Sequence, residues 1–258
     1  MATNGALHAL LLLSDSALPL GSFAFSSGLE SFLAHHKHNS ASHRLQAFDH
    51  FLEHSVANIA STAIPYVVSG YHNPDSLEEL DNDFDASTPC TVARRASISQ
   101  GKALLAIWDR ALRSSLSPSS SPESQRAGAA LTAFSAALKT SKPDALGLQM
   151  NAHFPSLFGA VCCALSLPEH EATYLFLLNH AKTLLSAAVR ASVLGPYQSQ
   201  AVLASARLQG WIEASIASTA GGIGGKGGIA VEDAAVTVPP MDLWMGRHEL
   251  LYSRIFNS

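Results

Sequence analysis

Charged residues and cysteines are scarce in this chain of 258 residues. Only 14% of its residues are charged, whereas 47% are hydrophobic, and it contains three cysteines. Three cysteines are too few for a disulfide framework, and Cys162 and Cys163 are adjacent on a predicted helix and point in different directions. We therefore expect reduced thiols that pack as small hydrophobic groups in a cytoplasmic protein. Because few charges are available to cover the surface, we also expect partner proteins to bury part of its apolar area.

Long apolar runs and an excess of positive charge are absent as well. No apolar run reaches the roughly 18–20 residues that a membrane span requires. The short apolar stretch at 7–13 has no basic start and is soon followed by Asp15, so we do not expect a targeting signal. The formal net charge is −4, which does not favour nucleic acid as a partner. The sequence predicts a protein that binds neither membranes nor nucleic acid.

The glycine-rich segment at 221–228 lacks the essential residues of a phosphate-binding loop. Such a loop needs a glycine five residues before its Gly-Lys pair, where this chain has Ala220. It also needs a serine or threonine after the lysine to hold magnesium, and Lys226 is followed by Gly227. We therefore expect a linker here, and we expect no nucleotide site and no cofactor-binding residues in the chain.

Catalytic motifs are also missing. The pairs that begin at His170 and His248 start like the zinc-protease motif H-E-x-x-H, but Tyr174 and Tyr252 occupy the position of the second histidine. The nucleophile motif G-x-S-x-G does not occur. We predict that no residue of the chain is catalytic and that the protein is not an enzyme.

Histidine is abundant, with 12 residues, and two of them have a spacing that metal sites use. His50 and His54 are four residues apart on a predicted helix, which places both imidazoles on one face. Against a metal site, no cysteine or third ligand stands nearby in the sequence. Two interpretations stay open, solvated polar residues and a weak metal site at His50 and His54.

Helix signals dominate the chain. Alanine and leucine are abundant, and no stretch alternates polar and apolar residues with β-branched side chains. We predict an all-α fold, a single-domain helical bundle over residues 1–258. The expected helices cover 23–36 with Ser22 as N-cap, 91–115, 125–140, 154–165, a segment that starts at a Ser166–Glu169 capping box, and 198–216. Three insertions are expected to be loops, the acidic segment 71–90, the Ser/Pro segment 114–124 and the glycine-rich segment 219–230.

Two regions near the C-terminus suggest contacts with other proteins. Arg190 ends an apolar helix, where it either caps the last carbonyl groups or belongs to an interface with Gln198 and Gln200. The tail at 241–258 is too apolar to lie free in water, so it packs either on its own domain or on a partner.

Four segments of the chain resemble the UreF family of urease accessory proteins, and they occur in the family's order. The first is Ser14–Glu30, with its Leu-Pro-Leu-Gly-Ser-Phe run. The second is 101–105, and the third begins with His-Phe-Pro at 153–155 and continues through Arg190. The fourth is the closing segment 247–258. The turn at 195–200 departs from the family's usual pattern and is similar to that of eukaryotic members.

This resemblance implies an all-α homodimer that acts as a non-catalytic scaffold in urease maturation. Such a protein bridges the accessory protein UreD (also called UreH) and the GTPase UreG on apo-urease, and it gates GTP-dependent nickel insertion. Nickel and GTP are then handled with the partner proteins. We expect the tail 241–258 to be mobile alone and ordered on the UreD-type partner. The candidate partner-binding residues are Arg190, Gln198, Gln200, Trp244, Arg247, Tyr252, Arg254, Ile255 and Phe256. The alternatives are a His-rich metal-binding helical enzyme and a generic helical interaction module.

Overall fold

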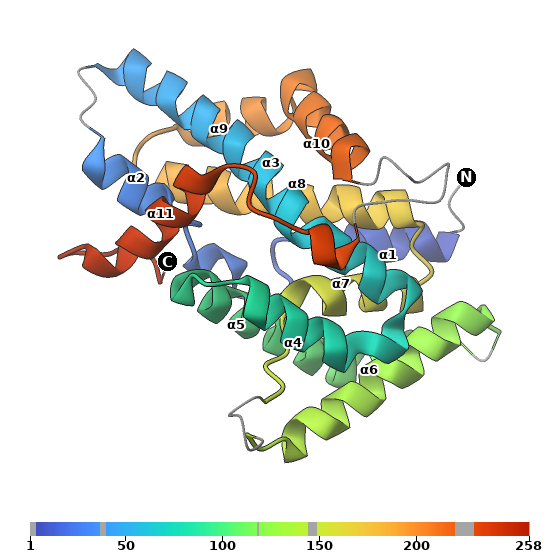
Figure 1. Cartoon of the computed structure of the whole chain (residues 1–258). Coiled ribbons are helices and arrows are strands. Elements are labelled where there is room, and N and C mark those ends of the chain that lie inside the picture. The colour runs from blue at the N-terminus through green and yellow to red at the C-terminus, as the bar shows by residue number, and fades with distance from the viewer. Residues whose placement is uncertain (1–3, 37–39, 118, 144–148, 220–229, 258) are drawn as a thin grey trace. The chain divides into compact units, whose positions relative to one another are not determined.

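The computed structural model describes residues 4–36, 40–117, 119–143, 149–219 and 230–257, and in these ranges every regular element is a helix (Figure 1). The prediction of an all-α fold is confirmed. The α-helices are α1 (Asn4–Ser14), α2 (Leu29–His35), α3 (Ala41–His72), α4 (Leu77–Ser87), α5 (Thr91–Ile107), α6 (Pro122–Thr140), α7 (Phe154–Ala164), α8 (Glu169–Arg190), α9 (Pro196–Leu203), α10 (Ala206–Thr219) and α11 (Pro239–Arg247). None of the described helices is long and apolar enough to cross a membrane.

Short helices of other types connect these elements. The 3-10 helices are η1 (Ser22–Ala24), η2 (Pro74–Ser76), η4 (Arg113–Ser115), η5 (Val231–Asp233) and η6 (His248–Leu250), and a π-helical turn, η3 (Trp108–Leu112), follows α5. The chain divides into two compact units. The first comprises Met1–Gly21, Tyr66–Pro89 and Ser97–Phe176, and the second Ser22–Pro65, Cys90–Ala96 and Leu177–Ser258. The boundary of a single domain over 1–258 stays a prediction.

The first unit is built around α7, which is buried from its second residue to its last. Glycines let other backbone segments approach closely. A Cβ atom on Gly159 would lie 1.9 Å from the carbonyl oxygen of Val67, and one on Gly101 would lie 1.9 Å from that of Ala152. Real Cβ contacts are never so short, so only glycine permits this packing. Cys162 and Cys163 are free and buried in α7, as expected of small hydrophobic groups, and burial raises the pKa of the Cys162 thiol.

The N-terminus of α7 is held by buried polar side chains. Asp81, which is 1% exposed, accepts hydrogen bonds from the backbone N–H groups of Asn151, Ala152 and His153 at 2.6, 3.2 and 2.5 Å. The buried ring of His153 donates from Nε2 to Asp85 at 3.0 Å and accepts at Nδ1 from the Ser97 hydroxyl at 3.1 Å. The N–H groups of the three residues that precede this helix are therefore bound by Asp81, and the N–H of its first residue, Phe154, is bound by the Ser97 hydroxyl at 3.1 Å.

The acidic segment 71–90 is helical, so the prediction of a solvated loop there was wrong. It contains the end of α3, η2 and α4. Leu77, Leu80 and Phe84 lie at helical spacing and are buried, and Asp81 faces inward beside them. The abundance of carboxylates concealed this apolar stripe, and the burial of Asp81 depends on a segment 70 residues away along the chain.

The other two expected insertions have different outcomes. The segment 114–124 enters α6 earlier than predicted, because Ser121 is the N-cap and its hydroxyl accepts from the N–H of Ser124 at 3.2 Å. Most of the glycine-rich segment, 220–229, lies outside the described residues.

Two predicted helix starts were wrong as well. Ser22 begins the short η1 instead of capping a helix over 23–36, and α2 starts only after Gly28, which is in the left-handed conformation at φ 84°. Ser166 also has a positive φ, 59°, and its hydroxyl bonds to that of Ser124, so α8 begins at Glu169 without the predicted capping box.

Candidate partner-binding surface

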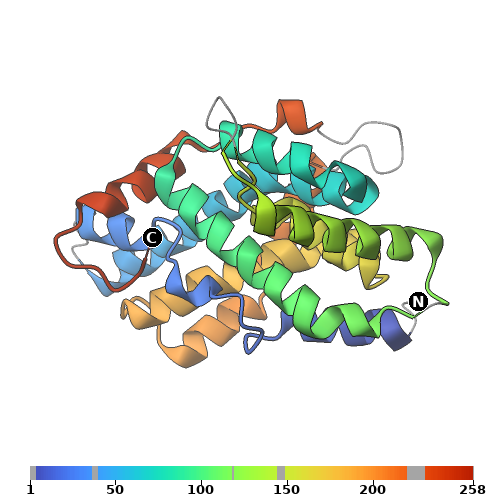
Figure 2. The same cartoon turned by 90° about the horizontal axis from the view of Figure 1, so that it is seen from below.

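In the second unit α11 packs against α2 (Figure 2). Aromatic side chains fill this contact. The Trp244 ring on α11 lies 5.6 Å from the ring of Phe32 and 5.0 Å from that of His36. The guanidinium of Arg247 lies 5.7 Å from the Trp244 ring. A Cβ on Gly28 would lie 3.0 Å from the backbone nitrogen of Met245, and its positive φ also favours glycine. Gly28 thus allows the close approach that the aromatic contact needs.

Beyond α11, residues 248–257 form what we call the C-terminal segment, and Glu30 of α2 holds its backbone. The Glu30 carboxylate accepts hydrogen bonds from the N–H of Ile255 at 2.6 Å and from the N–H of Phe256 at 3.2 Å. The next residue, Asn257, donates its N–H to the carbonyl oxygen of Ala24 at 2.8 Å. Three consecutive backbone N–H groups of the segment are therefore bound by Glu30 of α2 and Ala24 of η1.

Arg190 holds the same region through its side chain. It is the last residue of α8, its guanidinium lies 4.2 Å from the centre of the Phe256 ring, and its Nη2 donates to the carbonyl oxygen of Phe23. Phe256 itself is 5% exposed. Both contacts lie within the chain, and neither the capping role nor the interface role considered from the sequence anticipated them.

His248 lies beneath the C-terminal segment with no exposed side-chain surface. Its Nε2 donates to the carbonyl oxygen of Phe256 at 3.2 Å. Its Nδ1 lies 3.7 Å from a carboxylate oxygen of Glu30 and has no hydrogen-bond partner in the described part of the chain. Removal from water lowers the pKa of His248, although the Glu30 charge acts in the opposite direction. The imidazole is therefore held neutral beside a carboxylate.

Charged side chains lie along the outer side of the segment. Arg95 donates to the Glu249 carboxylate at 2.6 Å and to the carbonyl oxygen of Asn257 at 2.9 Å. Arg254 bonds to the same carboxylate at 3.0 Å. These hydrogen bonds, the one from Arg95 above all, lower the pKa of Glu249. The pairs are exposed and screened by water, so we expect them to contribute little to stability.

The C-terminal segment has one buried and one exposed face. His248 and Phe256 are buried, whereas Leu250 is 76% exposed, Tyr252 fully exposed and Ile255 63% exposed. The expectation that the chain's own fold does not hold its tail was wrong, because Met241 of α11, His248 and Phe256 are buried within the second unit. Binding of this tail by a partner, and its ordering there, stay predictions.

Comparison with known proteins identifies the family. The sequence model of the UreF family matches residues 43–207. A UreF-like urease accessory protein of Schizosaccharomyces pombe is 37% identical over 251 residues, which cover 97% of each chain. The chain belongs to the UreF family. Other relatives are urease accessory protein 6 of Cryptococcus neoformans, 29% identical over 98% of this chain and 97% of that protein, and urease accessory protein F of Arabidopsis thaliana, 27% identical over 95% and 90%.

The four segments that resemble UreF proteins contact one another within the units, and Arg190 of the third segment touches both Phe23 of the first and Phe256 of the fourth. In the second unit, residues 22–30 of the first segment bind the closing segment 247–258, through Glu30 and Ala24. In the first unit, Gly101 of the second segment lies against Ala152 and His153 at the start of the third. The residues that carry the family resemblance therefore lie at two contact regions, one in each unit.

The remaining predicted partner-binding residues of this UreF protein lie on α9. The side-chain oxygen of Gln198 accepts from the N–H of Gly195 at 2.9 Å and so caps the helix, and Gln200 is exposed. No hydrogen bond or ion pair joins either glutamine to the C-terminal segment within the described residues. The grouping of Arg190 with these glutamines at one interface stays a prediction.

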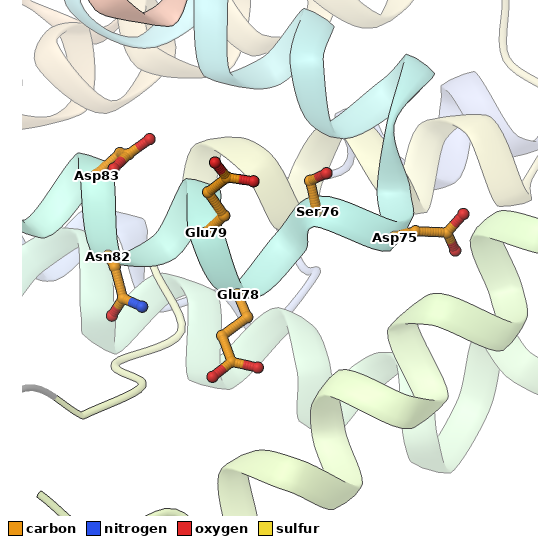
Figure 3. Close-up of a pocket in the computed structure, with 6 residues that line it drawn as sticks. All are labelled: Asp75, Ser76, Glu78, Glu79, Asn82 and Asp83. Carbon is orange, nitrogen blue, oxygen red and sulfur yellow. The ribbon is translucent and has the colours of Figure 1, made fainter. Parts of the chain in front are cut away.

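The acidic and histidine-rich regions do not assemble a metal centre in the part of the chain that the structure describes. His50 and His54 are exposed on α3 with ring centres 6.4 Å apart, and their role as a weak metal site stays a prediction. A shallow pocket on η2 and α4 is lined by acidic residues, but their side chains diverge (Figure 3). One of them, Asp75, is paired with Arg126 at 2.6 Å.

Sequence reasoning gave Glu30 no role, and it placed His248 in a failed protease motif and in the closing segment of family resemblance without a role of its own. Glu30 ends the first segment of family resemblance, and that position was the one signal available. Its function as an acceptor depends on residues 225 positions away in the chain. No local pattern reports such a contact.

Proposed function

We propose that this UreF-family protein is a non-catalytic scaffold of urease maturation. It binds a UreD (UreH)-type accessory protein, a UreG-type GTPase and apo-urease, and through them supports GTP-dependent nickel insertion. In this proposal the protein works in the cytoplasm as a homodimer and has no cofactor of its own. Nickel and GTP are held with the partner proteins. Support comes from the family membership and from the relatives named urease accessory proteins.

The observation that carries the proposal is the exposed apolar face of the C-terminal segment. Leu250, Tyr252 and Ile255 lie within six residues of one another, and all three are largely exposed. Burying three such side chains yields about 5–9 kcal/mol before other terms are subtracted. The backbone of the segment is already hydrogen-bonded, so less conformational entropy is lost on binding than for a free tail. This face is therefore suited to a stable protein partner.

The proposal is tested by polar substitution of this face. A variant with Leu250, Tyr252 and Ile255 changed to serine is placed in a urease-positive host whose own copy is deleted. We expect the variant to fold but to lose capture of the UreD-type protein, and urease to contain little nickel and show low activity. The control is Leu11→Ser on α1, another exposed leucine in the first unit. Undiminished capture and nickel content in the triple variant would contradict the assignment of this face.

The non-catalytic part of the proposal has its own test. The purified protein, shown to be free of the GTPase, should neither bind nor hydrolyse GTP, because its one Gly/Lys segment lacks both essentials of a phosphate-binding loop. The alternative of a metal-binding enzyme gains no support from the described residues, where no three potential ligands converge.

A further inference from the structure

We propose that Glu30 is the positioning residue of the partner-binding face: its carboxylate sets the C-terminal segment in the register that presents Leu250, Tyr252 and Ile255 together. The inference rests on the function proposed above. Glu30 acts through the backbone N–H groups of Ile255 and Phe256. The hypothesis concerns how the face is built, and it has consequences for the free protein as well as for the complex.

The two carboxylate oxygens of Glu30 match two adjacent backbone N–H donors. One carboxylate oxygen accepts from Ile255 and the other from Phe256, at 2.6 and 3.2 Å. Residues 255 and 256 lie in a bend of the chain, and their side chains have different surroundings. Here Ile255 is 63% exposed and Phe256 is 5% exposed. Because both backbone N–H groups are fixed on one carboxylate, the pair of hydrogen bonds selects which of the two side chains faces outward.

The Glu30 carboxylate is itself largely removed from water. The Glu30 side chain is only 11% exposed, and a buried carboxylate needs hydrogen bonds or a positive partner. The neighbouring His248 forms no hydrogen bond to it, because the Nδ1 atom lies 3.7 Å from the carboxylate oxygen. The two backbone donors are therefore the main compensation for the burial of Glu30, and the carboxylate and the segment depend on each other.

The other contacts of the segment fix the positions of its exposed residues less tightly than the hydrogen bonds to Glu30 do. Arg190 stacks on Phe256, a contact that tolerates sliding and rotation of the ring. Arg95 and Arg254 bind Glu249 in exposed pairs, which hold geometry weakly. Only Glu30 forms paired hydrogen bonds to consecutive backbone groups on the buried side of the segment within the described residues.

The decisive variant is Glu30→Gln, which keeps the shape of the side chain. Glutamine has one acceptor oxygen and one NH₂ donor, so one of the two backbone N–H groups would face another donor. In hydrogen exchange of the full-length free protein, we expect protection of the Ile255 and Phe256 amides to fall by about tenfold or more. The amides of Ala152 and His153, which Asp81 holds in the first unit, should be unchanged. The same protection at Ile255 and Phe256 in variant and wild type would overturn the proposal.

Capture of the UreD-type protein supplies the second readout. We expect Glu30→Gln to weaken capture by about tenfold, with unchanged helical circular dichroism and with recovery at higher partner concentration. The matched control is Glu249→Gln, which removes a carboxylate from the exposed side of the same segment and should stay within about threefold of wild type. Equal losses in both variants would show that charge, and not register, matters, and would contradict the proposal. If Glu30→Gln misfolds, Glu30→Asp, which is one methylene shorter, is used for the same two measurements.

The two hypotheses fail in different ways. If the free protein loses protection in Glu30→Gln but the triple serine variant still captures the partner, the positioning by Glu30 stands and the binding face is wrong. If the triple variant loses capture and Glu30→Gln changes neither protection nor capture, the face stands and the positioning is wrong.

Discussion

Asp81 in the first unit and Glu30 in the second carry out the same local chemistry with different results. Each buried carboxylate accepts hydrogen bonds from consecutive backbone N–H groups, and each lies near a buried histidine. His153, beside Asp81, has both ring nitrogens bonded, whereas Nδ1 of His248, beside Glu30, has no partner in the described part of the chain. Asp81 binds the residues that lead into the buried helix α7, whereas Glu30 binds a segment with an exposed face. The comparison shows that the same kind of hydrogen bonding stabilises a buried part of one unit and positions a partly exposed segment in the other.

The largest effect is expected at Asp81. Asp81→Ala leaves the buried N–H groups of Ala152 and His153, and the partly buried one of Asn151, without their acceptor. Each buried group costs about 1–3 kcal/mol, so the unfolding free energy should fall by about 2–6 kcal/mol. Denaturant unfolding measures this loss. The control Asp83→Asn, on the exposed side of the same helix, should change stability by less than about 0.5 kcal/mol. A small effect of Asp81→Ala would remove the contrast between the two units.

The next effect tests the packing around α7. Gly159→Ala places a methyl group 1.9 Å from a backbone oxygen of Val67, so the helices must separate, at a cost of about 1–3 kcal/mol. Gly210→Ala is the matched control on α10, where nothing lies within 4 Å, and should stabilise the protein by about 0.5–1 kcal/mol. Thermal melting compares the two, and opposite signs are expected.

Arg190 should show a moderate effect confined to the C-terminal segment. Arg190→Ala removes the contact with the Phe256 ring and the hydrogen bond to Phe23, for a loss of about 1–2 kcal/mol of local stability. Hydrogen exchange should show faster opening at Phe256 and Asn257, while helical circular dichroism is kept. Loss of the whole fold in this variant would show that Arg190 supports more than the segment.

The last effect is the response to acid, and it concerns the second unit. Burial lowers the pKa of His248, and it lowers that of His180 in α8 to about 4. The folded second unit therefore prefers the neutral imidazoles. Their contribution is fully present above the ordinary histidine pKa of about 6.5 and is lost as pH falls through the lowered values.

Protection of the Ile255 amide, corrected for the intrinsic exchange rate, reports on His248. The groups that face this imidazole are Glu30 on α2 and Glu249 and Arg254 on the segment itself. We expect protection to fall as the pH drops below about 6.5, by at most about 1.4 kcal/mol per pH unit for one group. The variant His248→Gln should flatten this dependence. Protection that rises in acid would mean that a protonated His248 strengthens the contact with Glu30.

Local patterns predicted much of the fold and little of the site. The helices over 91–115, 125–140 and 154–165 were recognised, because alanine, leucine and helix-ending residues act within a few positions. The apolar character of the tail was also evident, and three of its residues are exposed as a binding face requires. The helix in the acidic segment was missed, because three buried apolar side chains lie among many carboxylates.

By itself, the sequence determined the helical class, the absence of recognisable catalytic motifs and the resemblance to UreF proteins, since all three are read from neighbouring residues. Only the tertiary structure decided what Glu30, Arg190 and Asp81 do. Glu30 bonds to a residue 225 positions away, and Arg190 to one 167 positions away. A buried carboxylate and an exposed one have the same letter in the sequence, and the difference arises only when distant segments supply the backbone donors that compensate for burial.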